Sequence, residues 1–272
     1  MRSKYGSNRC QAEAKVFLGF KSLIYNKPSF FIFPFYFSIV LTILPFIAII
    51  VAGVYYAITR NKLTVTAAVT GAITATLVFA GAGYVGFVMM TLFFLLGTLA
   101  TGHKMNVKKQ IGIAEANKGR RTASQVLANA GVQGLLGLLM VVDVQHQPLY
   151  LLMIAAGFSS ATADTLSSEL GSVYGTRFYN IINFKKDLRG LNGVVSLEGT
   201  LAGFAGSCII ALLYAIAAGF AKGFIIVIIA GTAGNLFDSV MGATLERKGL
   251  LKNDGVNLLN TAFAAVVAWA MF

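Results

Sequence analysis

The chain is organised as apolar stretches of about 20 residues or more, separated by short polar segments. A helix of that length crosses the hydrocarbon core of a bilayer, where only helices and closed barrels satisfy all backbone hydrogen bonds. Charged residues make up only 12% of the 272 residues, about half of their usual share in soluble domains. The sequence therefore predicts an all-α fold, a polytopic transmembrane helical bundle with about seven to eight spans.

The predicted spans follow from the lengths of the apolar stretches. The stretch Ser29–Thr59 contains Pro34 and Pro45, and Leu63–Ala100 is long enough for a helical hairpin that turns near Gly81–Gly83. Further spans are expected at Ala123–Val142, Leu149–Ala163, Val194–Gly219, Phe224–Met241 and Val256–Phe272.

Basic residues concentrate in three predicted loops, His103–Arg121, Asp164–Gly193 and Glu246–Asp254. Lys and Arg in short loops stay on the cytoplasmic side of a membrane, and the turns between these loops hold almost no basic residues. We therefore expect the polar loops to gather on the cytoplasmic face. The formal net charge of +12 has the same explanation, so we expect no nucleic-acid partner.

The basic N-terminal segment, residues 1–28, is also expected on the cytoplasmic side. A single span up to Arg60 would place it on the outer side instead. Either the chain around Pro45 forms a re-entrant hairpin, or this segment is an exception to the charge rule, and the sequence leaves both open. Residues 29–272 are expected to form a single transmembrane domain.

Two familiar site patterns are excluded. The segment Gly81–Gly86 fits the dinucleotide pattern G-x-G-x-x-G, but no strand precedes it and no acidic residue lies where a ribose would bind, so we interpret it as a helix turn. The two histidines and the two cysteines lie far apart in the sequence, which argues against a metal site built from thiolates or imidazoles.

A cluster of carboxylates and hydroxyls interrupts an apolar stretch in the second half of the chain. Acidic groups at membrane depth are costly and need partners. On a helix Asp164 shares a face with Ser168, four residues further on, and Glu169 follows directly. Such oxygen ligands suit Mg²⁺, as does Asp238 within another apolar stretch. A capped helix end or a hydrogen-bonded set between helices would explain the same residues.

Basic and amide side chains accompany these carboxylates. Arg121, Gln125 and Asn129 recur every four residues where a span begins, and such a stripe must face protein or a cavity. Arginine binds phosphate through two parallel hydrogen bonds, although a topological anchor would use the same residue. Asn192 and Ser196 lie at an expected helix start, which favours an anion site or a plain turn.

These clusters all belong to loops predicted on one face, and Asn257 at the start of the last span adds another amide. Carboxylates for a divalent cation, basic groups for phosphate and amides for a polar ligand, at the mouth of an apolar bundle, indicate a site for a phosphorylated lipid.

The order of these motifs resembles the membrane family that contains transmembrane protein 19 and the plant phytyl-phosphate kinase of vitamin E synthesis. The resemblance covers roughly residues 61–261. It is carried by Lys62-Leu63-Thr64, Gly119-Arg120-Arg121, Gln125-Val126-Leu127-Ala128-Asn129, Ala163-Asp164-Thr165, Ser168-Glu169, Asn192-Gly193, Ser196-Leu197, Gly199-Thr200, Asp238, Gly242-Ala243-Thr244, Val256-Asn257 and Asn260-Thr261. The sequence departs from the family pattern at Leu166, at Val194-Val195 and in its longer basic N-terminus.

The resemblance implies a kinase that transfers a phosphoryl group from a nucleoside triphosphate, with CTP favoured, to an isoprenyl monophosphate. It implies Mg²⁺ as the counter-ion and residues 29–272 as the catalytic domain. From the distribution of basic residues we expect the active face on the cytoplasmic side of the bilayer, which would be the cytoplasmic membrane in a prokaryote. The catalytic and metal-binding residues would be Asp164, Glu169 and Asp238. The substrate- and nucleotide-binding residues would be Lys109, Arg120, Arg121, Gln125, Asn129, Ser168, Asn192, Ser196 and Asn257.

Two rival classes use similar residues. A lipid-phosphate transporter or flippase would need polar features on the opposite face or inverted repeats, and the sequence shows neither. A CTP-dependent lipid cytidylyltransferase or a CDP-alcohol phosphotransferase would also bind Mg²⁺ and phosphates, but the signature of the latter is absent because Asp254-Gly255 is followed by Val256-Asn257. The oligomeric state and the length of the prenyl chain stay open.

Overall fold

The computed structural model describes residues 28–112 and 120–272, with side chains from residue 40 onward. The predictions for the segment 1–27 and for Gly119 lie outside the described residues. The elements in chain order are α2 (Pro28–Thr59), α3 (Val65–Gly102), α4 (Met105–Gln110), α5 (Ala123–Val142), η2 (Val144–His146), α6 (Gln147–Tyr174), β1 (Tyr179–Asn180), β2 (Val194–Val195), α7 (Leu197–Ala218), α8 (Lys222–Met241), η3 (Gly242–Glu246) and α9 (Asn253–Met271).

Helix α2 runs without a break through Pro34 and Pro45. The re-entrant hairpin considered at Pro45 is therefore not formed, which fits the tolerance of membrane helices for proline. The chain divides into two compact units, residues 1–53 and 54–272, and their boundary falls within α2. The helical bundle around α6 and the candidate site described below belong to the second unit.

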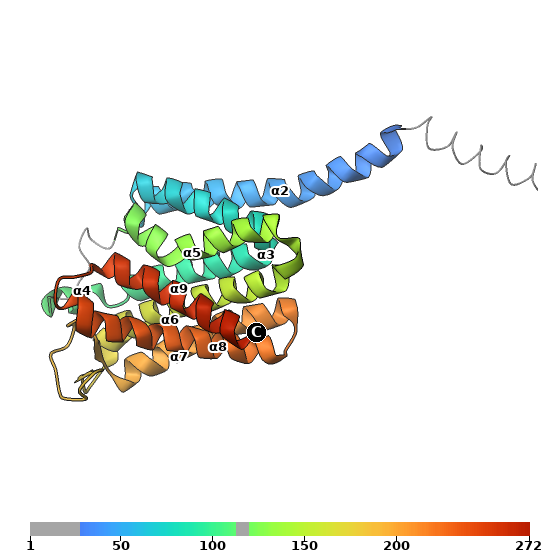
Figure 1. The fold of residues 1–272 in the computed structure, drawn as a ribbon. Helices are drawn as coiled ribbons and strands as arrows, with labels where there is room; N and C mark the ends of the chain where they lie inside the picture. The colour runs from blue at the N-terminus through green and yellow to red at the C-terminus, as the bar shows by residue number, and fades with distance from the viewer. Residues whose placement is uncertain (1–27, 113–119) are drawn as a thin grey trace, which may run out of the picture. The chain divides into compact units, whose positions relative to one another are not determined.

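Helix α3 is a hairpin of two arms, as the sequence predicts. Gly83 lies inside it with φ +58° and ψ −150°, a non-helical conformation that glycine adopts at little cost. Two residues at opposite ends of this stretch, Thr64 and Gly97, both lie beside Arg121. The Thr64 N–H donates to the Arg121 carbonyl at 3.1 Å, and Gly97 faces the Arg121 guanidinium. A straight helix would separate these two residues by about 50 Å, so the chain turns back at Gly83 (Figure 1).

Helix α6 is the centre of the bundle and packs against α3, α5, α7, α8 and α9. Its middle is a run of small residues, and Ala155, Ala156 and Ser159 are fully buried. Small side chains let helix backbones approach closely in a membrane, where burial of apolar surface no longer favours one helix neighbour over lipid. Glycines lie at these close contacts: Gly231 of α8 lies directly against Ser159, and Gly157 of α6 lies against the side chain of Gln133 in α5.

The predicted loop from Asp164 to Gly193 starts later than the sequence suggests, because α6 remains helical as far as Tyr174. Its polar residues from Asp164 to Ser172 line a cavity within the bundle, so they do not end the helix. The true loop begins at Gly175 and contains the antiparallel pair of β1 and β2, two residues each.

Six of the described helices are long and apolar enough to cross a membrane, which confirms the polytopic helical fold. These are Val40–Thr59, Val65–Gly102, Ala123–Val142, Val144–Tyr174, Leu197–Ala218 and Lys222–Glu246. The hairpin α3 counts once among them, and α9, where the sequence predicts the last span, is not included. The number of spans and the side on which the loops lie stay predictions.

Candidate functional site

A polar cavity of about 340 Å³ lies at the end of the bundle where α6, α8 and the second arm of α3 end and where α5, α7 and α9 begin. The three predicted polar loops therefore meet at one end of the second unit (Figure 1). Ten of the predicted site residues line the cavity, namely Arg121, Gln125, Asn129, Asp164, Ser168, Glu169, Asn192, Ser196, Asp238 and Asn257. The other two, Lys109 and Arg120, are not among the lining residues.

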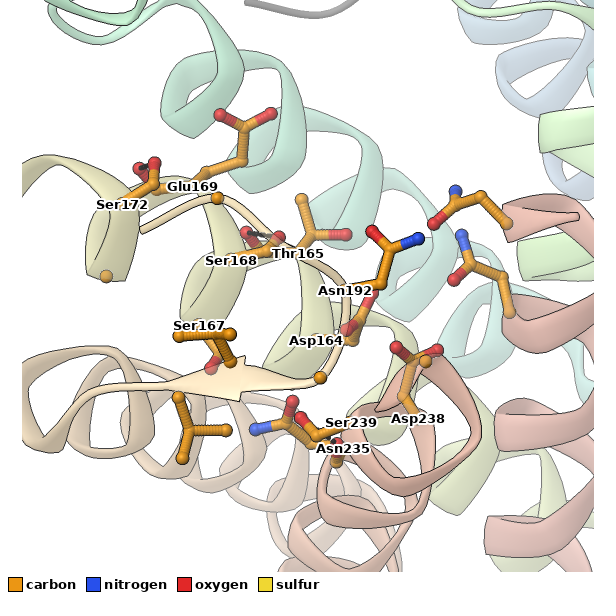
Figure 2. Close-up of a pocket in the computed structure, with 18 of the residues that line it drawn as sticks. Asp164, Thr165, Ser167, Ser168, Glu169, Ser172, Asn192, Asn235, Asp238 and Ser239 are labelled. Atoms are coloured by element: carbon orange, nitrogen blue, oxygen red, sulfur yellow. Dashed lines mark hydrogen bonds between the residues drawn. The ribbon is translucent and has the colours of Figure 1, made fainter. Parts of the chain in front are cut away.

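Two carboxylates from different helices face one another in this cavity. Asp164 of α6 and Asp238 of α8 interact directly through their side chains, and Figure 2 shows them pointing toward one another. The Asn260 side-chain amide donates to Asp238 Oδ2 at 2.6 Å, which fixes one side of the pair. Glu246, from the π-helical turn η3 after α8, adds a third carboxylate nearby and accepts from the Asn192 side chain.

Glu169, the third predicted metal ligand, points away from this pair (Figure 2). It forms an ion pair with Lys108 of α4, whose side chain is only 2% exposed. Lys108 also donates to the carbonyls of Ala100 and Thr101, at 2.7 and 3.2 Å, so its three N–H groups are all used. In the part of the chain that the structure describes, no three His, Cys, Asp or Glu side chains are grouped closely enough to hold a metal ion.

Arg121 is held by the segment just before α3, and its side chain reaches the second arm of α3. Its backbone N–H donates to the Lys62 carbonyl at 3.0 Å in a short parallel bridge. Its guanidinium carbon lies 5.4 Å from the ring centre of Phe93, and the missing side chain of Gly97 makes room for the guanidinium. Arg120 instead directs a guanidinium nitrogen toward the Leu63 carbonyl, 3.5 Å away.

The start of α5 uses the predicted amide stripe partly for its own stability. Thr122 and Gln125 form a capping box, in which Gln125 Oε1 accepts from the Thr122 N–H at 2.8 Å. One turn further, Asn129 donates through Nδ2 to the Gln125 carbonyl at 2.9 Å. The other amide atom, Asn129 Oδ1, is buried and has no hydrogen-bond partner among the described residues. It is therefore an acceptor available at the wall of the cavity.

The loop before α7 closes one side of the cavity. Gly193 has φ +73°, and any side chain there would collide with Ala243, so this close approach requires glycine. Ser196 is the N-cap of α7, where its hydroxyl accepts from the Gly199 N–H at 3.1 Å. That hydroxyl is thus a structural cap that also lines the cavity.

An ion pair fastens the same loop to the segment after α8. Arg247 donates to Asp187 Oδ2 at 2.8 Å and, through Nε, to the Asn192 carbonyl. The Leu188 N–H and Arg247 together hold the pKa of Asp187 below its usual value. Because Asn192 lies in this loop, the ion pair positions a residue of the cavity.

Four residues in or beside the cavity are not among the predicted site residues. Lys108 is adjacent to the predicted Lys109, and only Lys108 turns inward. Gly97 lies in an apolar stretch whose composition suggests only helix packing. Asn235 and Glu246 belong to the same polar cluster as Asp238 in the sequence, but the sequence assigns neither of them a role in the site.

The charges of the lining decide which ligands the cavity can accept. It contains four carboxylates and one guanidinium. Such a lining repels a polyphosphate unless cations accompany it, and it attracts divalent cations. The amides add neutral groups that can orient a polar ligand.

The sequence matches the family described as Integral membrane protein DUF92 over residues 48–265. It is 34% identical to Protein VTE6, chloroplastic, of Arabidopsis thaliana over 208 residues, which are 72% of this chain and 61% of that protein. The chain therefore spans less than two thirds of the length of that relative. It is 33% identical to an uncharacterized membrane protein of Synechocystis, and the match covers 71% of this chain and 76% of that protein. It is also 33% identical to an uncharacterized membrane protein of Methanocaldococcus jannaschii, where the match covers 68% of this chain and 75% of that protein. No solved structure matches the chain.

Proposed function

The chain belongs to the DUF92 family of integral membrane proteins, and from that premise we propose that it is a prenyl-monophosphate kinase. It would transfer the terminal phosphoryl group of a nucleoside triphosphate, with CTP favoured, to an isoprenyl monophosphate. The products would be the prenyl diphosphate and the nucleoside diphosphate. The observation that carries the proposal is the facing pair of Asp164 and Asp238 in a cavity that also presents Arg121 and several asparagine amides.

The chemistry asks little of a general base. A terminal oxygen of the prenyl monophosphate is already anionic at neutral pH and forms the new bond to the γ-phosphorus, while the bond from that phosphorus to the β–γ bridging oxygen breaks. Catalysis of such a transfer rests on positioning and on neutralising charge. The cavity lining contains carboxylates, a guanidinium, amides and hydroxyls, and these groups suit positioning and charge neutralisation.

Mg²⁺ fits the residues that lie together here. Two facing carboxyl groups are stable at such close approach only when a cation lies between them or when they share a proton. Mg²⁺ is commonly bound through one or two carboxylates together with substrate phosphates and water, so a third carboxylate is not required. We propose Asp164 and Asp238 as its ligands, where it would neutralise the donor phosphates. Glu169, paired with Lys108, would position the wall of the cavity instead.

The remaining residues divide into phosphate-binding and orienting groups. Arg121 would bind a phosphate through its planar guanidinium, which Phe93 and Gly97 hold in place. Asn129, Asn192 and Asn257 line different walls and would orient the donor or the acceptor. We propose that the exposed Lys109, and Arg120 next to Arg121, do not bind the ligand directly and only add positive charge near the cavity.

The position of the cavity suits an acceptor with a lipid tail. The cavity lies at the end of an apolar bundle, so a phosphate can enter it while the prenyl chain stays in the bilayer. We propose, from the concentration of basic residues in the same loops, that this end faces the cytoplasm.

The test is nucleotide turnover by the purified protein in lipid nanodiscs. We expect conversion of CTP to CDP only when a prenyl monophosphate and Mg²⁺ are both present, with one prenyl diphosphate formed for each CDP. The matching prenyl alcohol, which lacks the anionic oxygen, should give no turnover. Failure of every nucleoside triphosphate to yield a prenyl diphosphate would overturn the proposal. Release of pyrophosphate with formation of a CDP-lipid would favour a cytidylyltransferase.

A further inference from the structure

The polar stripe of α5 continues past the cavity into the membrane interior. Arg121, Gln125 and Asn129 line the cavity, and Gln133 follows at the same spacing of four residues. Residues four apart on a helix lie one above the other on the same face. Gln133 therefore lies one turn below Asn129, near the middle of α5 (Ala123–Val142).

Both turns carry amide atoms without partners. Gln133 is 0% exposed, and neither its Nε2 nor its Oε1 has a hydrogen-bond partner among the described residues. The same holds for Asn129 Oδ1, directly above it. Most buried polar groups in proteins are paired, and an unpaired amide in a membrane interior is especially unfavourable. Three unpaired atoms on consecutive turns therefore indicate a small ligand that the two side chains share.

The surrounding helices pack closely against the Gln133 amide and close the path beneath it. Gly157 of α6 lies directly against the amide, and a side chain there would occupy the same place. Deeper along α5, Gly137 packs against the backbone of Leu77 in α3. Gln133 itself is fully buried and is not among the residues that line the cavity, so a path from the cavity to Gln133 would run along the same face of α5, past Asn129.

The chemistry of the unpaired atoms specifies the ligand. The Gln133 amide group needs an acceptor, while Gln133 Oε1 and Asn129 Oδ1 need donors. An ionised phosphate cannot donate, a metal ion cannot accept, and a prenyl chain does neither. Water does both, and buried waters occur where two to four polar partners surround them.

We infer that the cavity extends below Asn129 as a water-filled shaft that ends at Gln133. The shaft gives the cavity a hydrated floor about one helical turn inside the apolar bundle. This inference is independent of the proposed kinase activity, because it concerns water alone.

The test measures whether water reaches Gln133. Full-length protein in nanodiscs, with Cys10 and Cys208 replaced by alanine, receives Gln133→Cys and is treated with a small methanethiosulfonate amine, which reacts with thiolates in water. We expect labelling at least tenfold faster than for Leu136→Cys, a buried position on the same helix. Equal rates at the two positions would overturn the inference.

The route of the water is tested by blocking it from above. Asn129→Leu combined with Gln133→Cys should slow labelling about tenfold or more, because the apolar side chain replaces the amide between cavity and shaft. Labelling that is unchanged by Asn129→Leu would mean that water does not arrive from the cavity, and the inference would fail.

A second variant keeps the test valid if Gln133→Cys does not fold. Gln133→Met conserves the volume and the helix propensity of glutamine, and its oxidation by hydrogen peroxide reports access of an aqueous oxidant. We expect its oxidation to be several-fold faster than that of Met140, which is buried on the same helix. Oxidation as slow as that of Met140 would count against the shaft.

Discussion

Replacing Lys108 with methionine removes the charge that holds α4 and the end of α3 to α6. The side chain is 2% exposed and contacts Glu169, the Ala100 carbonyl and the Thr101 carbonyl. Methionine keeps most of the volume and all of the helix propensity, so the loss is chiefly electrostatic. The variant leaves the Glu169 carboxylate and two carbonyl groups without their donor.

The expected cost follows from the burial of the pair. Breaking a buried ion pair by removing one partner destabilises proteins by about 3–5 kcal/mol, whereas exposed pairs contribute about 0–1 kcal/mol. Since Lys108 is buried, we expect about 3–5 kcal/mol, or a fall in melting temperature of roughly 6–20 °C for a chain of this size. Thermal unfolding in nanodiscs, followed by tryptophan fluorescence or circular dichroism, measures this shift.

Two further variants decide whether the ion pair is the cause. Lys109→Met, one residue away and exposed, should change stability by less than about 0.5 kcal/mol. Adding Glu169→Gln to Lys108→Met should recover part of the loss, because the unpaired carboxylate is then neutral. If Lys108→Met and Lys109→Met cost the same, the pair does not hold these helices and the reasoning is wrong.

Three further outcomes are expected. Asp164→Asn should leave the melting temperature nearly unchanged but lower the proposed kinase turnover by orders of magnitude, and high Mg²⁺ should restore part of the turnover. The control Asp143→Asn, at the other end of α5, should not change CDP formation in the same assay. Gly97→Ala should weaken phosphate binding about tenfold, as measured by calorimetry, because the added methyl group displaces the Arg121 guanidinium. The control Gly71→Ala should bind phosphate normally, since its added methyl group would meet only a Val126 methyl at 4.0 Å. Folding lowers the pKa of Asp187, so the stabilisation from its carboxylate is complete above about pH 4 and is lost as the pH falls through the lowered pKa. Protease cleavage of the loop that contains Asp187 should therefore increase at low pH. Asp187→Asn should abolish this dependence of cleavage on pH.

The sequence predicts much of the fold because the bilayer imposes a simple rule. Apolar length identifies the helices, and the glycine pair around residue 82 correctly predicts the turn of the α3 hairpin at Gly83. The end of α6 was misplaced because polar residues after Ala163 resemble a loop when their partners are unknown. Their helical state depends on tertiary packing around the cavity, and one-dimensional periodicity does not contain that information.

The site is predictable by residue type better than by exact position. The carboxylates at Asp164 and Asp238 stand out because acidic groups are costly in apolar stretches. The sequence does not distinguish Lys108 from Lys109, because α4 has only six residues and is too short for a periodic pattern to show which face is buried. The sequence also gives no indication of the role of Gly97, because that role depends on the Arg121 side chain, which is 24 positions away and contacts Gly97 only in the folded protein.

The central place of α6 has a consequence for how the protein is made. Of the six candidate spans, α6 has the lowest mean hydropathy and the largest buried share, and it carries Asp164 and Glu169. A newly synthesised segment of this kind partitions weakly into lipid while it is alone, because its acids have not yet met their partners. Lys108 and α5 leave the ribosome before α6, whereas Asp238 and Asn260 follow after it. We therefore expect α6 to remain near the translocon until α8 and α9 arrive, so that its commitment to the bilayer and the assembly of the cavity occur in one step.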